Sequence, residues 1–238
     1  MSDEKPKRIE PYPQEDDRSL PYHVARTALD AGASLVPGAG YAIGELVRHF
    51  IGEPLEKRRE EWFASLGEGV IELQGRLEGF DPASLSGNEE FISAVYETTQ
   101  HAMKTHHAEK REALRNAVLN VARGYSLDEV ERGAFMSVID RFSPFHLTVL
   151  RLLADPTSHA GYMRAVHNAV MGSRETYISR ALHGQANDGA LGRVLDDLRR
   201  EGLTDGSERG GVSGTALIAS ATTPSGNRFL RFVSSPTE

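Results

Sequence analysis

The chain contains 238 residues, of which 39% are hydrophobic and 26% are charged, and its formal net charge is −7. This composition is that of a globular protein that can form one large core or two smaller ones. Cysteine is absent, which excludes disulfides, thiolate metal sites and thiol nucleophiles. The acidic balance argues against general coating of nucleic acid, because contacts to phosphates need a basic surface.

Residues 1–18 form the first predicted segment. They are polar and charged and include three prolines, so we expect a disordered N-terminal arm that buries little apolar surface. The segment has no apolar middle of the kind found in secretory signal peptides. Together with the lack of cysteine, this favours a cytoplasmic location.

Residues 19–142 are predicted to form a helical region. Asn88, followed by two glutamates, is a typical helix start. The segment 126–129 has the form of a capping box, with Ser126 as the cap and Glu129 as its partner. A long stripe of apolar residues at intervals of three and four predicts a helix that packs through one face, and it consists of Trp62, Leu66, Val70, Leu73, Leu77 and Phe80.

Residues 143–238 are predicted to form a separate C-terminal domain. Ser143 and Pro144 suit the cap and first turn of a short apolar helix, and two further helices are expected between residues 158 and 182. A last amphipathic helix ends near Leu203. A glycine-rich loop at residues 210–214 follows, and residues 216–222 are small and compatible with a strand. Residues 223–226 have the composition of a turn and precede the apolar run Phe229–Val233.

Two phrases near the C-terminus resemble a winged helix: LGRVLDDLRREGLT at residues 191–204 and TTPSGNRFLRFV at residues 222–233. The resemblance implies that the first phrase ends the third helix of that fold and that the second closes its wing. The predicted fold class is therefore mainly α, with a helical bundle followed by a winged-helix-like C-terminal domain with a small β-wing.

The layout of the whole chain resembles that of bacterial proteins of the abortive-infection-alpha kind, which pair a helical region with a C-terminal winged helix and are suspected of phage defence. The segments that carry this resemblance are LVPGAGYAIGEL (residues 35–46), EKREALRNAVLN (109–120) and SPFHLTVLRLLADP (143–156). The resemblance implies no catalytic residue. The chain departs from DNA-reading members in lacking a basic recognition helix.

Three glycines, Gly32, Gly40 and Gly44, are candidates for close helix packing. Two pairs of small residues four apart, Ala28 with Gly32 and Gly40 with Gly44, allow helices to approach each other closely. The uncharged run at residues 31–44 has 14 residues, short of the roughly 20 that span a bilayer. Helix packing or oligomerisation is therefore the first interpretation, and membrane insertion is the second.

No catalytic or metal-binding arrangement is predicted, and no cofactor or small-molecule substrate is expected. Arg141 and His146 have the R-x4-H spacing of helical ribonucleases, but Pro144 lies between them and would take the two side chains off a common helical face. No nucleophile, base and orienting group stand at a recognisable spacing. We therefore expect a protein that is not an enzyme.

The candidate binding surface is a group of arginines, because arginine suits bidentate contacts to phosphate or carboxylate. A winged helix would bring the third helix and the wing together. Asp196 and Asp197 lie among these arginines and favour ion pairs within the helix. A self-neutralised surface is therefore the first interpretation and a phosphate-binding patch the second, and the group comprises Arg193, Arg199, Arg200, Arg228 and Arg231.

Three hypotheses of function follow, in this order. The first is a non-enzymatic bacterial adaptor or regulatory protein that acts through protein–protein contacts or self-association, with the role in phage defence that the resemblance implies. The second is a winged-helix regulator that binds DNA through the five arginines. The third is a membrane-active effector that uses the glycine-rich helices.

Overall fold

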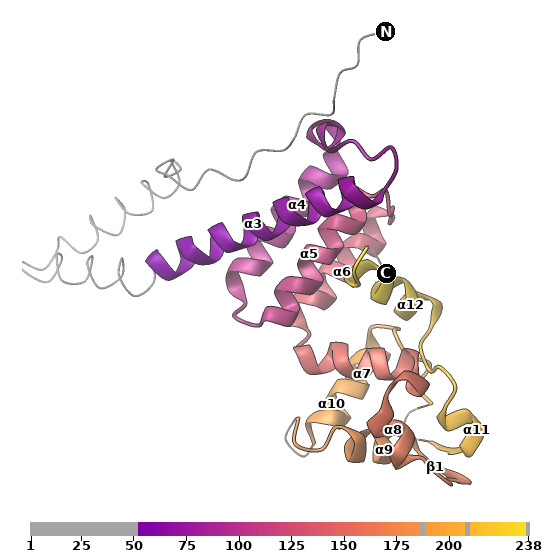
Figure 1. Ribbon diagram of the computed structural model, residues 1–238. Coiled ribbons are helices and arrows are strands. Elements are labelled where there is room, and N and C mark those ends of the chain that lie inside the picture. Colours follow the sequence, from indigo (N-terminus) through magenta and orange to yellow (C-terminus); the bar gives the residue numbers. More distant parts are fainter. Residues whose placement is uncertain (1–51, 186–188, 208–209, 237–238) are drawn as a thin grey trace, which may run out of the picture. The chain divides into compact units, whose positions relative to one another are not determined.

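The computed structural model describes residues 52–185, 189–207 and 210–236 (Figure 1). Within these residues the protein is mainly helical, with a small two-stranded sheet, and the prediction of a mainly α protein is confirmed. The chain divides into two compact units, one ending at His106 and the other beginning at His107.

The first unit contains α3 (Glu53–Arg76), the 3-10 helix η2 (Pro82–Gly87) and α4 (Glu89–Lys104). The predicted stripe forms the buried face of α3 over Trp62, Leu66, Val70 and Leu73. The indole of Trp62 donates a hydrogen bond to Thr99 Oγ1 at 2.9 Å, so α3 and α4 are joined by a polar contact as well as by packing. Asn88 caps α4 as expected, because its side chain accepts from the Phe91 amide.

The second unit holds the other helices and both strands. The helices are α5 (Ala108–Ala122), α6 (Glu129–Arg141), α7 (Pro144–Ala154), η3 (Pro156–Ser158), α8 (Ala160–Ala165), α9 (Arg174–Ala181), α10 (Ala190–Arg200), α11 (Gly214–Leu217) and α12 (Pro224–Val233). The strands β1 (Met171–Ser173) and β2 (Gly211–Ser213) pair antiparallel, with Gly172 opposite Val212. Figure 1 shows the sheet at one end of this unit, next to α11.

In the second unit, α5 packs against α12. The last carbonyls of a helix have no partners within it, and here side chains of α5 supply them. Asn120 Nδ2 donates to the carbonyls of Arg231, Phe232 and Ser234 at 2.8–3.0 Å. Asn116 Nδ2 donates to the carbonyl of Val233 at 3.1 Å. The end of α12 is therefore capped by a helix more than a hundred residues earlier in the chain.

This pairing explains where the chain divides. The C-terminal domain predicted from the sequence starts at Ser143, whereas the second compact unit of the structure begins at His107. The difference arises because α5 and α6 pack within the same unit as α12. Phe135 of α6 makes an edge-to-face contact with Phe229 of α12, with ring centroids 5.3 Å apart.

The interpretation of Phe229–Val233 as a wing strand is wrong, since these residues belong to α12. Thr223 caps this helix through its side chain, and Pro224 occupies its first turn. A proline is tolerated there because the backbone amides of the first turn have no hydrogen-bond partner within the helix. Phe229, Phe232 and Val233 are fully buried, and their spacing of three and one is helical. A β-bridge lies just before this helix, where Thr204 pairs with Thr222 in the antiparallel direction.

Gly32, Gly40 and Gly44 lie outside the described residues, so the helix-packing and membrane hypotheses stay predictions. Among the helices that the structure describes, none combines the length and apolarity that crossing a bilayer requires.

Candidate functional site

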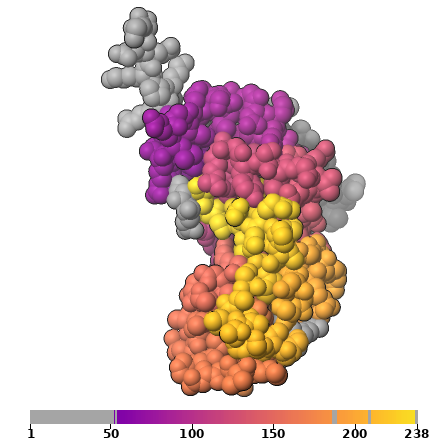
Figure 2. Space-filling view, turned by 90° about the vertical axis from the view of Figure 1, so that its right-hand side faces the viewer, coloured from indigo at the N-terminus to yellow at the C-terminus, as the bar shows by residue number. Residues whose placement is uncertain are grey.

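An open groove of about 730 Å³ lies on the second unit. We call it the α6–α12 groove, because its walls come from the first half of α6, the start of α12 and the turn that follows α10. Figure 2 shows α12, in yellow, at the surface between the pink residues that include α6 and the orange residues that include α10. The groove is lined by Asp128, Glu129, Val130, Glu131, Ala134, Phe135, Val138, Glu201, Leu203, Ser225 and Arg228.

The floor of the groove is apolar and rigid. Phe135, Val138 and Leu203 are each no more than 3% exposed. Phe135 also contacts Phe232, with ring centroids 5.9 Å apart. Side chains packed this closely hold one arrangement, so the floor keeps its shape without a ligand.

Val130 stands at the rim of the groove and is 82% exposed. It follows Asp128 and Glu129, and the Asp128 carboxylate caps α6 by accepting from the Glu131 amide at 2.8 Å. A large exposed apolar side chain beside an apolar floor and among carboxylates is a feature of surfaces that bind other proteins.

Two ion pairs join the walls of the groove. Arg228 Nε of α12 lies 2.5 Å from Glu131 Oε1 of α6, and Arg141 at the end of α6 lies 2.9 Å from Glu201 after α10. The side chains of Glu131 and Glu201 are only 18% and 20% exposed, so these pairs lose part of their contact with water. With four carboxylates and only Arg228 among its lining residues, the groove is acidic.

The five candidate arginines do not form one surface. Arg199 and Arg200 pair with acids on their own helix, α10: Arg200 lies 2.8 Å from Asp197, and Arg199 lies 3.9 Å from Asp196. Arg193 is exposed near the start of α10, and Arg228 and Arg231 belong to α12. The helix that would read DNA in a winged helix is therefore largely neutralised by its own aspartates.

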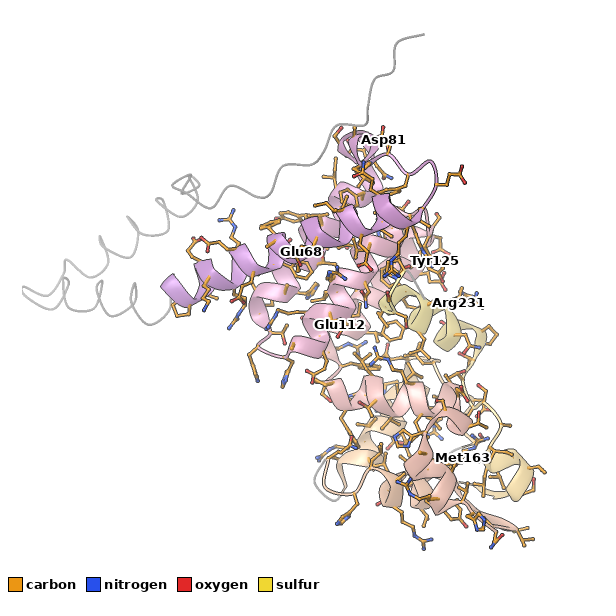
Figure 3. The ribbon with its side chains drawn as sticks, in the orientation of Figure 1. Glu68, Asp81, Glu112, Tyr125, Met163 and Arg231 are labelled. Atoms are coloured by element: carbon orange, nitrogen blue, oxygen red, sulfur yellow. The ribbon has the colours of Figure 1, made fainter. Side chains whose placement is uncertain are left out.

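The arginines of α12 lie instead with two residues of the α5 end, Arg123 and Tyr125. The Tyr125 hydroxyl donates to the Arg228 carbonyl at 3.3 Å, and Figure 3 shows Tyr125, in the loop after α5, near Arg231 of α12. Burial raises the pKa of the Tyr125 hydroxyl, and the positive charge of Arg231 opposes this shift. We call Arg123, Tyr125, Arg228 and Arg231 the α5–α12 arginine cluster.

Ser143, His146 and Asp197 also come together, although they are far apart in sequence. Ser143 Oγ lies 2.9 Å from His146 Nδ1, and His146 Nε2 lies 3.4 Å from Asp197 Oδ2. The Ser143 amide also donates to His146 Nδ1 at 3.1 Å, which makes Nδ1 an acceptor and places the proton on Nε2. None of the three lines the α6–α12 groove.

The stability of the protein should depend on pH through His146. Burial lowers the pKa of this imidazole, which stacks on Phe142 and is only 13% exposed. The folded state therefore takes up a proton less readily than the unfolded chain, so stability falls as the pH drops below about 6.5. We expect the free-energy advantage of the wild type over His146→Gln to shrink between about pH 7.5 and pH 5.5 in denaturant titrations. A constant difference over this range would refute the assignment.

In the part of the chain that the structure describes, no three His, Asp or Glu residues form a group that could hold a metal ion.

Val130, Glu129 and the two residues that follow α5, Arg123 and Tyr125, were not predicted from the sequence. An isolated valine on the polar side of an amphipathic helix is a signal that could have found Val130. Nothing local could have found the arginine cluster, because it depends on the pairing of α5 with α12.

No protein-family model, curated protein or solved structure matches this chain.

Proposed function

We propose that the protein is a non-enzymatic adaptor or regulatory protein that binds another protein in the α6–α12 groove. The observation that carries this proposal is Val130, which is 82% exposed beside a floor of buried apolar residues. An exposed apolar side chain that a partner covers contributes to the binding free energy, because its surface leaves water. The acidic rim would then select the partner and set its orientation.

The paired charges of α10 favour a protein partner over DNA. A recognition helix needs arginines or lysines that are free to reach base edges and phosphates, and Arg199 and Arg200 are held by Asp196 and Asp197. The acidic lining of the groove would also repel a phosphate backbone.

The contacts of Ser143, His146 and Asp197 favour a structural role over catalysis. A hydroxyl nucleophile needs a neighbouring base that is free to take its proton, whereas His146 Nδ1 already accepts the Ser143 amide. Asp197 is shared with Arg200 at 2.8 Å. These bonds fix the first turn of α7 and join it to α10.

We also propose that residues 143–238 form a winged-helix-like domain. The order of α7, α9 and α10 supports this proposal, as does the antiparallel pairing that follows them. The Asp205 amide donates to the Ala221 carbonyl at 2.9 Å, and the Thr223 amide donates to the Leu203 carbonyl at 3.0 Å. In this assignment the described residues between 205 and 221, which are 206–207 and 210–220, belong to the wing, and α12 follows it.

The resemblance to proteins of the abortive-infection-alpha kind suggests phage defence as the setting for such an adaptor. This part of the proposal is tested by comparing plaque numbers on bacteria that carry the gene with those on bacteria that carry a Val130→Asp copy. Equal plaque numbers on both strains, and on a strain without the gene, would count against it.

Direct evidence for the groove would come from affinity purification with Val130→Asp. Burying a new carboxylate beneath an apolar side chain of the partner is unfavourable, so we expect at least about tenfold less of a specific partner to be recovered, which corresponds to about 1.4 kcal/mol of binding free energy. Val170→Asp is the matched control, because Val170 is 86% exposed in the same unit but does not line the groove. Equal losses for both variants would refute the groove as the docking site.

A further inference from the structure

The α5–α12 arginine cluster is a second surface, and its charge is opposite to that of the groove. Arg228 and Arg231 are three residues apart on α12, so their side chains leave the same side of the helix. The Arg228 carbonyl accepts a hydrogen bond from Tyr125 in the loop after α5, and the Arg231 carbonyl accepts one from Asn120 of α5. Arg123 comes three residues after Asn120 on the same segment. The pairing of the two helices therefore brings three guanidinium groups together around one phenol ring.

The cluster has few acids to balance it. Glu131 is the acid that pairs with Arg228, and it also acts on Tyr125. Arg123 donates to the Pro236 carbonyl at 2.6 Å, which is a neutral acceptor. Arg231 is exposed and has no ion pair with any residue that the structure describes. Among the residues that the structure describes, no acid pairs with Arg123 or Arg231, in a protein whose net charge is −7.

We propose that the α5–α12 arginine cluster binds the phosphate groups of single-stranded nucleic acid. Guanidinium groups give bidentate hydrogen bonds to phosphate, and a partly exposed aromatic ring beside them offers a surface on which a base can stack. Tyr125 is held in place on one side by Phe232, with ring centroids 6.4 Å apart, so its ring does not need to be ordered when a ligand binds. Free inorganic phosphate offers the same oxygen atoms to the arginines, so the test must distinguish it from the phosphates of a nucleic acid.

The arginine cluster differs from the recognition helix of a winged helix. It employs Arg228 and Arg231 with Arg123 and Tyr125, whereas the arginines of α10 take no part. Nucleic acid would therefore approach the α5–α12 junction and leave the α6–α12 groove to a protein, although Arg228 belongs to both surfaces.

The test uses the full chain and a fluorescein-labelled oligothymidine of about 15 nucleotides, with binding measured by fluorescence anisotropy at a series of salt concentrations. For single strands, log K falls against log salt with a slope of about −0.7 for each phosphate contact. We expect a slope near −1.4 for the wild type, from contacts by Arg123 and Arg231, and a slope smaller in magnitude by about 0.7 for Arg231→Gln. Arg199→Gln is the matched control, because Arg199 is an exposed arginine of the same unit, and it should leave the slope unchanged.

The tyrosine is tested separately from the charge. Tyr125→Phe keeps the ring and should bind like the wild type, whereas Tyr125→Leu should weaken binding about fivefold or more without changing the salt slope. Circular dichroism of each variant verifies that it is folded.

Competition distinguishes the two sources of phosphate. Inorganic phosphate added at constant ionic strength should leave the oligonucleotide bound if the site recognises the polymer, and should displace it if free phosphate is the true ligand. The proposal is overturned if Arg231→Gln and Arg199→Gln change the slope equally, or if neither changes it. It is also overturned if a phosphopeptide binds more tightly than the oligonucleotide. Because these variants leave Val130 intact, this result is independent of the adaptor proposal.

Discussion

Replacing Asn120 by aspartate is expected to lower the free energy of unfolding by about 4 kcal/mol at neutral pH. Asn120 is fully buried, and its Nδ2 donates to three carbonyls at the end of α12. A carboxylate has no proton to donate, and it would place a negative charge beside carbonyl oxygens at the negative end of the helix dipole. Chemical denaturation monitored by far-ultraviolet circular dichroism measures the effect.

Two comparisons separate the effect of the added charge on stability from the effect of the lost hydrogen bonds. Asn120→Ala removes the donor without adding a charge, and we expect it to cost about 3 kcal/mol. The carboxyl introduced by Asn120→Asp would have a raised pKa in the folded state, so this variant should regain stability as the pH falls and the carboxyl becomes protonated. Asn116→Ala is the milder control, because Asn116 supplies one hydrogen bond. Equal stability of Asn120→Asp and Asn120→Ala at neutral pH would contradict this explanation.

Local pattern was sufficient to predict several elements. The stripe that begins at Trp62 gave the buried face of α3, because intervals of three and four specify one side of a helix. Ser143 and Pro144 start α7 as expected, since a capping side chain and a proline in the first turn act within a few residues. These features need no knowledge of the rest of the chain.

The first residue of a helix was harder to predict where two possible N-cap residues lie close together. The capping box predicted at Ser126 is displaced, because α6 is capped by Asp128, whose carboxylate accepts the Glu131 amide. Leu127 is buried just before it, which fixes the direction in which the chain enters the helix. Both Ser126 and Asp128 suit an N-cap, and the burial of Leu127 selects between them.

The last helix shows what local pattern cannot decide. Phe229–Val233 is rich in aromatic and β-branched residues, which favour strands, yet it forms the end of α12 because Phe229, Phe232 and Val233 are buried on one helical face. The side-chain amides that donate hydrogen bonds to its final carbonyls belong to Asn116 and Asn120 of α5. Contacts over such a separation depend on the tertiary structure, and the α5–α12 arginine cluster could be found only together with them.

The two proposed sites depend on this same pairing. Arg228 reaches Glu131 across the groove, and it also stands beside Tyr125 in the arginine cluster. Its position is set by where α12 begins and ends. The start of α12, at Thr223 and Pro224, is therefore as important to the groove as Asn120 is to the end of the helix.

Gly226 is the residue that lets α12 begin where it does, and we expect Gly226→Ala to lower the free energy of unfolding by about 3 kcal/mol. A Cβ at this position would overlap the carbonyl oxygen of Leu203, the same carbonyl that accepts the Thr223 amide at 3.0 Å. The clash is with backbone, so it cannot be relieved by turning a side chain. Relief would require α12 to move away from the turn after α10, which would open the α6–α12 groove at Leu203.

Gly133→Ala is the matched control for this prediction, because Gly133 lies inside α6 of the same unit and an added Cβ would meet no atom within 4 Å. Alanine is the better helix former, so this change should raise stability by up to about 1 kcal/mol. Opposite signs for the two glycine-to-alanine changes in denaturant titrations would therefore locate the effect at the contact with Leu203. If Gly226→Ala is as stable as the wild type, the start of α12 is not held against the Leu203 carbonyl, and the groove lacks the wall on which the adaptor proposal depends.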